Sequence, residues 1–66
     1  MRTKLKVFRI MQKLNQHKMA AKLGYERAYY GHVERGFQSG SAAFWERLQK
    51  AFGLTDIELE ELKEVD

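Results

Sequence analysis

Few side chains in this sequence have the type and spacing that chemistry at a site requires. The chain of 66 residues contains no cysteine, which excludes a thiolate nucleophile, a disulfide framework and every zinc site built on cysteine. Its two histidines, His17 and His32, stand apart from any cluster of metal ligands. No nucleophile with an adjacent base, no pair of carboxylates in an apolar setting and no phosphate-binding glycine loop is recognisable. We therefore expect neither an enzyme nor a metal or cofactor site.

Charge is distributed unevenly along the chain. Residues 1–54 contain eleven Lys and Arg residues and three acids, whereas residues 55–66 contain one lysine and six acids. The net charge of +3 is thus the sum of +8 and −5. A basic body favours an anionic partner, nucleic acid or an anionic membrane surface, although it also serves solubility. Since no apolar stretch is long enough for a signal peptide or a membrane span, we expect a cytoplasmic protein.

The elements that must position these charges are short helices. Apolar residues recur at helical spacing in five segments, which predicts an all-α fold in one domain, residues 1–66. The expected helices cover residues 3–13, 16–23, 27–35 and 42–52, with a fifth that begins after Thr55. Start signals are the possible N-caps Asn15 and Ser41 and the capping box from Thr55 to Glu58. Stop signals are Gly24, Gly36 and Gly53.

The apolar positions within each expected helix predict its buried face. These positions are Leu5, Phe8 and Met11 in the first helix, Phe44, Leu48, Ala51 and Phe52 in the fourth, and Ile57, Leu59, Leu62 and Val65 in the fifth. Arg9 is an exception, because it falls between apolar neighbours. The other basic residues near the start of the chain are expected to be largely solvated: Arg2, Lys4, Lys6 and Lys13.

Residues 16–35 form the pattern that carries a function. Two short helices joined by a glycine turn, the second with a polar outer face, predict a helix-turn-helix, a motif that projects its second helix into a major groove. Ala20 is small where the helices would cross, and Gly24 permits the left-handed turn. The expected shared core is Met19, Leu23, Tyr30 and Val33, and the expected outer face of the second helix is Arg27, Ala28, Gly31 and His32.

This pattern resembles the phage Cro/repressor (XRE-type) helix-turn-helix family. The resemblance covers roughly residues 5 to 55 and is carried by Leu14-Asn15-Gln16, Met19-Ala20, Leu23-Gly24, Val33-Glu34-Arg35-Gly36, Arg9, and Leu48 with Ala51-Phe52-Gly53-Leu54. It implies a compact five-helix lambda-repressor-like domain. It also implies a sequence-specific regulator of transcription, a repressor that inserts the third helix into the major groove as a homodimer on a two-fold operator. The short length and the segment 44–50 resemble small regulators of phages and integrated elements of Gram-positive bacteria.

The resemblance assigns roles to individual residues. It implies that Arg9 and Glu34 form a buried structural ion pair. It implies that the base-reading residues are Arg27, Ala28, Gly31 and His32. Arg27 leads this group because its guanidinium can meet a guanine bidentately. Phosphate contacts are expected from Gln16 first and then from Tyr29, Arg35, Gln38, Ser39 and Ser41. Without the surrounding motif, Arg27 and His32 would be ordinary solvated helix residues.

Three positions depart from the family pattern, and two of them, Glu26 and Gly31, leave a second function open. Glu26 stands where a small hydroxyl residue usually caps the third helix, Gly31 weakens that helix, and Tyr30 is larger than the usual aliphatic residue. The alternative is therefore a protein-interaction module, an antitoxin or anti-regulator, with weak or no DNA binding. Candidates for a two-fold contact are Phe37, Trp45 and the apolar edge of the fifth helix, although Phe37 and Trp45 are equally compatible with ordinary core or half-exposed positions.

Overall fold

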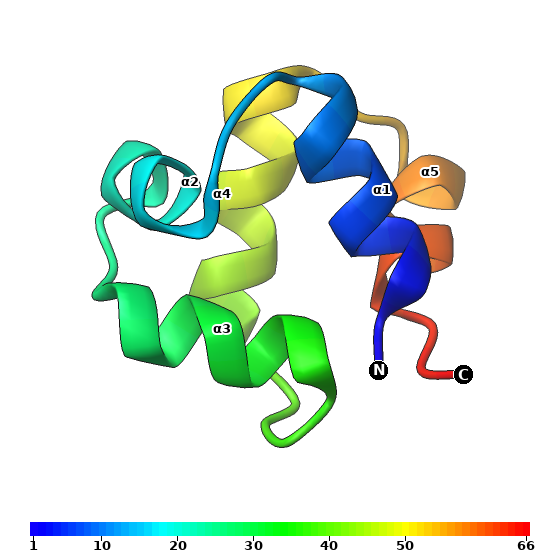
Figure 1. Cartoon of the computed structure of the whole chain (residues 1–66). Coiled ribbons are helices and arrows are strands. Elements are labelled where there is room, and N and C mark those ends of the chain that lie inside the picture. Colours follow the sequence, from blue (N-terminus) through cyan, green and yellow to red (C-terminus); the bar gives the residue numbers. More distant parts are fainter.

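A computed structural model describes all 66 residues and contains five α-helices and no strands. The helices are α1 (Thr3–Met11), α2 (Gln16–Leu23), α3 (Arg27–Arg35), α4 (Ala42–Phe52) and α5 (Asp56–Lys63). In Figure 1, α4 runs through the middle of the molecule, with α2 and α3 on one side and α1 and α5 on the other. The predicted all-α class, with a helix-turn-helix at α2 and α3, is confirmed. None of the helices is long and apolar enough to cross a lipid bilayer.

The helices begin where polar side chains satisfy free amide groups. The side chains of Asn15 and Ser41 each accept a hydrogen bond from the amide three residues further on, at 2.7 and 3.1 Å. Thr55 and Glu58 form a complete capping box at the start of α5. Each of these predicted start signals is confirmed. Glu26, in contrast, makes no capping hydrogen bond at the start of α3.

Three of the five helices end at a glycine in the left-handed conformation. Gly24, Gly36 and Gly53 follow α2, α3 and α4 with φ angles of 80°, 85° and 62°, which a residue with a Cβ adopts only at a cost. The first helix is shorter than predicted and ends at Met11. Lys13 has a φ angle of 60°, and a backbone in this conformation cannot continue a right-handed helix.

The core is one cluster to which all five helices contribute. Tyr30, Phe44 and Leu48 are fully buried, and the ring of Phe44 packs against those of Tyr30 and Trp45. The four residues predicted to join α2 to α3 are all buried. The complete cluster is Leu5, Met19, Ala20, Leu23, Tyr30, Val33, Phe44, Trp45, Leu48, Leu59 and Leu62. Packing therefore fixes the angle at which α3 leaves α2.

Four apolar residues expected to face the core do not, and one of them is Ala51 near the end of α4, which is exposed. Ile57 lies at the start of α5, exposed to solvent, and Val65 lies beyond the helix, which ends at Lys63. Only Leu59 and Leu62 of α5 are buried, because two turns of helix present a narrow apolar stripe. Met11, the last residue of α1, is also exposed. Helical periodicity overestimated the buried face at these helix ends.

Arg2 is buried, and the prediction that it is solvated is wrong. Its guanidinium donates to four main-chain carbonyls that come from three separate parts of the chain. The acceptors are the oxygens of Val33 at 2.6 Å, Gln38 at 2.8 Å, Lys63 at 2.9 Å and Ser39 at 3.3 Å. Its charged carbon also lies 5.4 Å from the centre of the Trp45 ring. Burial lowers the pKa of Arg2 from its ordinary value. Arg2 thus ties the start of α1 to the ends of α3 and α5.

Candidate nucleic-acid interface

A buried ion pair holds the recognition helix against the rest of the domain. Arg9 on α1 donates from Nε to Glu34 Oε2 at 2.9 Å and from Nη2 to Oε1 at 3.1 Å. Its Nη1 donates to the carbonyl of Leu14 at 2.9 Å. Gln16 on α2 donates from Nε2 to Glu34 Oε1 at 3.2 Å. One carboxylate on α3 therefore connects three helices, in the geometry that the resemblance implies.

The electrostatics of this cluster keep Glu34 ionised. Burial acts to raise the pKa of Glu34, but the hydrogen bonds from Arg9 and Gln16 outweigh it and hold that pKa below its ordinary value. The hydrogen bonds to Glu34 raise the pKa of Arg9 against the effect of its burial. Burial, reinforced by the nearby carboxylate, raises the pKa of Tyr30 far above its ordinary value, and the phenol oxygen makes no hydrogen bond of standard geometry. Tyr30 therefore stays neutral inside the core.

The exposed side of α3 forms a shallow concave surface with the start of α2. Its lining contains no acidic residue and consists of Gln16, Arg27, Ala28, Gly31, His32 and Arg35. All four predicted base-reading residues thus lie on one surface, together with two of the predicted phosphate contacts. Gly31 lies beside both of the latter: a Cβ built on it would be 3.4 Å from Gln16 Oε1 and 3.7 Å from Arg35 Nη1. Gly31 is itself buried beneath these two side chains, and because it has no side chain of its own they can lie close to the backbone of α3.

A second polar depression adjoins this surface at the start of α2. It is lined by Arg9, Asn15, Gln16, His17 and Arg27. The amide groups of Gln16 and His17 belong to the first turn and have no acceptor within the helix, so they are free to meet an anion. Sequence reasoning did not assign Asn15 or His17 to the interface. Their position at the N-terminus of the first helix of the motif is the signal that could have identified them.

The other predicted phosphate contacts lie at the opposite flank of α3 and in the loop that follows it. The Tyr29 hydroxyl accepts a hydrogen bond from the amide of Ser41 at 3.0 Å, while the Ser41 hydroxyl caps α4. The carbonyls of Gln38 and Ser39 point inward to Arg2, and both residues remain exposed. The six predicted phosphate contacts therefore form two groups. Gln16 and Arg35 lie on the concave surface, whereas Tyr29 lies on the opposite flank of α3 and Gln38, Ser39 and Ser41 lie in the loop after it.

The two aromatic residues considered for a two-fold contact lie in different environments. Trp45 is buried, and its Nε1 donates to the carbonyl of Ser39 at 3.0 Å, so it is unavailable to a second molecule. Its burial excludes it as a docking residue. Phe37 is 74 % exposed, with its ring centre 6.1 Å from that of His32. Phe37 thus lies beside the concave surface, at the end of α3.

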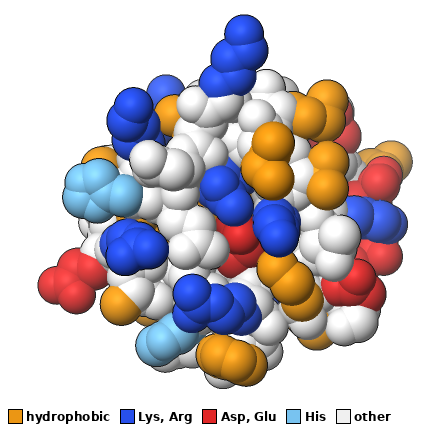
Figure 2. Space-filling model, in the orientation of Figure 1, with side chains coloured by type: hydrophobic (Ala, Val, Ile, Leu, Met, Phe, Trp, Pro, Cys, Tyr) orange, Lys and Arg blue, Asp and Glu red, His pale blue; other side chains and the backbone are white.

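Charge is separated in space as it is along the sequence. Figure 2 shows Lys and Arg side chains spread over the side formed by α2 and α3, with one acidic side chain at its edge, and a group of acidic side chains at the side of α5. Helix α5, which carries four of the nine acids, lies across α4 from α2 and α3 in Figure 1, whereas the residues after it reach the end of α3, where Val65 lies beside Gly36. An anionic polymer would therefore meet less repulsion on the α2–α3 side than on the α5 side.

Comparison with known proteins identifies the family. A family model described as a helix-turn-helix domain matches residues 1–62, which is nearly the whole chain. Neither the curated proteins nor the solved structures include a significant match. The match agrees with the observed packing of α2 against α3 around Ala20, Leu23 and Tyr30. This protein belongs to the helix-turn-helix domain family.

Proposed function

We propose that this protein is a sequence-specific regulator of transcription, a repressor that binds double-stranded DNA. The observation that carries the proposal is the concave surface on α3, where two arginines and a histidine lie together without any acidic residue. A helix with this face fits the major groove, in which arginine side chains meet base edges and phosphates. The ion pair between Arg9 and Glu34 supports this reading, because it fixes α3 to the body from behind.

Each residue of the surface has a specific role in this proposal. Arg27 at the start of α3 donates two hydrogen bonds to a guanine, and the methyl group of Ala28 contacts a thymine. His32 donates to a base or a phosphate, and Gly31 lets the backbone approach the DNA. Phosphate contacts come from Gln16, Tyr29, Arg35, Gln38, Ser39 and Ser41, and the amide of His17 adds one at the start of α2.

The proposal includes a homodimer on a two-fold operator whose half-sites lie about 34 Å apart, which is one turn of the double helix. Two copies of such a small domain read more sequence than one copy can. Within the helix-turn-helix family, we assign the chain to the phage Cro/repressor type. The buried pair of Arg9 and Glu34 and the segments that carry the resemblance support this assignment.

The alternative class is a protein-interaction module, an antitoxin or anti-regulator, with the same fold. Glu26 favours it, because its carboxylate at the start of α3 is exposed, makes no capping hydrogen bond and would repel nearby phosphates. The two functions differ in what a double substitution of Arg27 and His32 by alanine does. A regulator loses DNA binding while its fold stays intact, whereas an interaction module keeps its function in cells.

Selection of binding sites from a pool of random duplexes tests the proposal. We expect enrichment of an inverted repeat that the protein prefers to a scrambled duplex at near-physiological salt. Arg27→Ala should cost about 1–3 kcal/mol of binding free energy and relax the preference at one base pair. Lys50→Ala is the matched control, because it removes an exposed positive charge from α4. Absence of enrichment, with only salt-sensitive general binding, would refute a sequence reader.

A further inference from the structure

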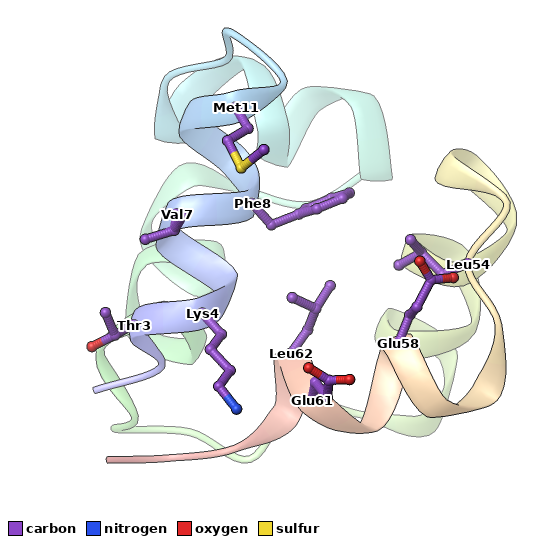
Figure 3. Close-up of a pocket in the computed structure, with 9 residues that line it drawn as sticks. All are labelled: Thr3, Lys4, Val7, Phe8, Met11, Leu54, Glu58, Glu61 and Leu62. Atoms are coloured by element: carbon purple, nitrogen blue, oxygen red, sulfur yellow. The ribbon is translucent and has the colours of Figure 1, made fainter.

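An apolar groove separates α1 from α5 and belongs neither to the closed core nor to the α3 surface. It is lined by Thr3, Lys4, Val7, Phe8, Met11, Leu54, Glu58, Glu61 and Leu62. In Figure 3, Phe8 and Leu62 lie deep between the two helices, Met11 lies at one end, and Lys4 and Glu61 lie on opposite walls at the other. Five of the nine lining residues are hydrophobic. Water therefore covers an apolar surface that a well-packed partner could cover instead.

The same face carries an exposed apolar ridge on α1. Val7, Ile10 and Met11 are 48 %, 54 % and 72 % exposed, and helical spacing places them along one side of the helix, where Val7 and Met11 form the rim of the groove and Ile10 lies beside it. One small domain thus presents a ridge and a groove side by side. This arrangement allows a two-fold contact, in which the ridge of each copy enters the groove of the other.

Charge on the two walls of the groove has opposite sign. Lys4 lies on the α1 wall, and Glu58 and Glu61 lie on the α5 wall. Lys4 pairs with Glu64 of its own chain at 3.1 Å, but both side chains are more than half exposed, so this pair is weak and easily exchanged. A surface whose two halves carry opposite charges is complementary to a second copy of itself after a two-fold rotation.

We propose that the α1–α5 groove is the dimer interface of this protein and that a second copy of the chain occupies it. Helix α1 of each copy faces the α5 wall of the partner, the ridge of Val7, Ile10 and Met11 lies against the partner's groove, and Lys4 of each copy faces the partner's Glu61. This inference rests on the proposed function, because it names the surface that joins the two DNA-reading copies. No residue that lines the groove belongs to α2 or α3, so a dimer formed here leaves both recognition helices uncovered (Figure 1).

Sedimentation equilibrium of the full chain tests the interface. We expect the wild-type protein to form a dimer over a series of concentrations up to about 1 mM. Val7→Glu puts a charge in the middle of the contact at a half-exposed position, so the chain should remain folded by circular dichroism and sediment as a monomer. Ile57→Glu is the control, because Ile57 is an exposed apolar residue of α5 outside the groove, and this variant should remain a dimer. A wild-type protein that is monomeric throughout, or dimers of Val7→Glu, would overturn the proposal.

Charge reversal tests the pairing of Lys4 with the partner's Glu61 directly. Lys4→Glu alone and Glu61→Lys alone each place like charges opposite one another and should each sediment as monomers. An equimolar mixture of the two variants restores both opposite-charge contacts, so it should form a heterodimer that neither variant forms with itself. If the mixture stays monomeric although the wild-type protein dimerises, Lys4 does not pair with the partner's Glu61.

The outcome for the interface is distinguishable from the outcome for DNA reading. A Val7→Glu monomer that still prefers one half-site over a scrambled duplex would support both proposals. A wild-type dimer without any sequence preference would uphold the interface and refute the DNA reader. A wild-type monomer that selects a half-site would refute the interface and uphold the DNA reader.

Discussion

Glu34 is a buried carboxylate whose negative charge stabilises the folded state. Its pKa lies below the ordinary value of 4.5, because Arg9 and Gln16 donate hydrogen bonds to it. The unfolded chain therefore binds a proton at Glu34 at a higher pH than the folded chain does. The stabilisation is fully present above pH 4.5 and is lost as the pH falls through the lower pKa of the folded state.

We expect Glu34→Gln to lower the free energy of unfolding at pH 7 by about 3 kcal/mol, because it leaves the buried guanidinium of Arg9 without a charged partner. The stability of this variant should also depend less on pH below 4.5 than that of the wild type. Urea unfolding at a series of pH values measures both effects. Glu60→Gln, which alters an exposed ion pair with Lys63, should leave the pH dependence parallel to that of the wild type.

Arg2 stabilises the fold through main-chain acceptors rather than through an acidic partner. We expect Arg2→Met to lower the free energy of unfolding by about 3 kcal/mol, because four carbonyls lose a charged donor. Lys6→Met, at an exposed position of α1, should change the stability by less than about 0.5 kcal/mol. Thermal and urea unfolding of both variants make the comparison. Equal stabilities of the two variants would contradict a stabilising role of Arg2.

At the scale of elements, Gly31 in α3 has opposite effects on folding and on DNA binding. Its backbone is helical and a Cβ would make only ordinary contacts, so Gly31→Ala should stabilise the domain by about 1 kcal/mol. The same methyl group would occupy the space between Gln16 and Arg35, two proposed phosphate contacts, and we expect the affinity for the selected site to fall about tenfold. Ala43→Gly, at an exposed position of α4, is the control, and it should destabilise the domain and leave the affinity for DNA unchanged. Higher stability with higher affinity for Gly31→Ala would contradict this role for Gly31.

The boundaries of α2, α3 and α4 could be predicted because their signals are local. Asn15, Ser41 and the glycines that follow the helices act on amides and carbonyls within a few residues, so the sequence alone contains both partners of each interaction. The burial of Arg2 could not be predicted, because its acceptors are main-chain carbonyls far along the chain. Every residue has such a carbonyl, so the sequence does not indicate which ones Arg2 will meet. Ile57 and Val65 were placed wrongly since periodicity does not tell where the last helix meets solvent.

The candidate site was predictable to the extent that it lies within the motif. The four base-reading candidates and Gln16 occur within seventeen residues, and helical spacing alone places the four on one side of α3. The inclusion of His17 and Asn15 depends on the angle between α2 and α3, which is set by packing around Ala20 and Leu23. That angle is a tertiary property, and the periodicity of one helix cannot supply it.

For the whole molecule, the separation of charge limits which surface meets DNA. Glu60 and Glu64 belong to the acidic side, and each takes part only in an exposed ion pair of little energetic value. Replacing both with glutamine should tighten binding to random duplexes at low salt, and the difference from the wild type should vanish as salt screens the charges. Fluorescence anisotropy at several salt concentrations measures this. Identical binding curves at low salt would show that the acidic side has no such effect.

The position of Trp45 has a consequence for experiments in solution. It is the single tryptophan, its indole N–H is bonded to the loop that follows α3, and its ring faces the Arg2 guanidinium. Its fluorescence emission therefore responds to the environment of one loop in a protein that carries no other such chromophore. An emission spectrum recorded with and without duplex would report movement of that loop on DNA binding, and the same signal would follow unfolding without any attached label.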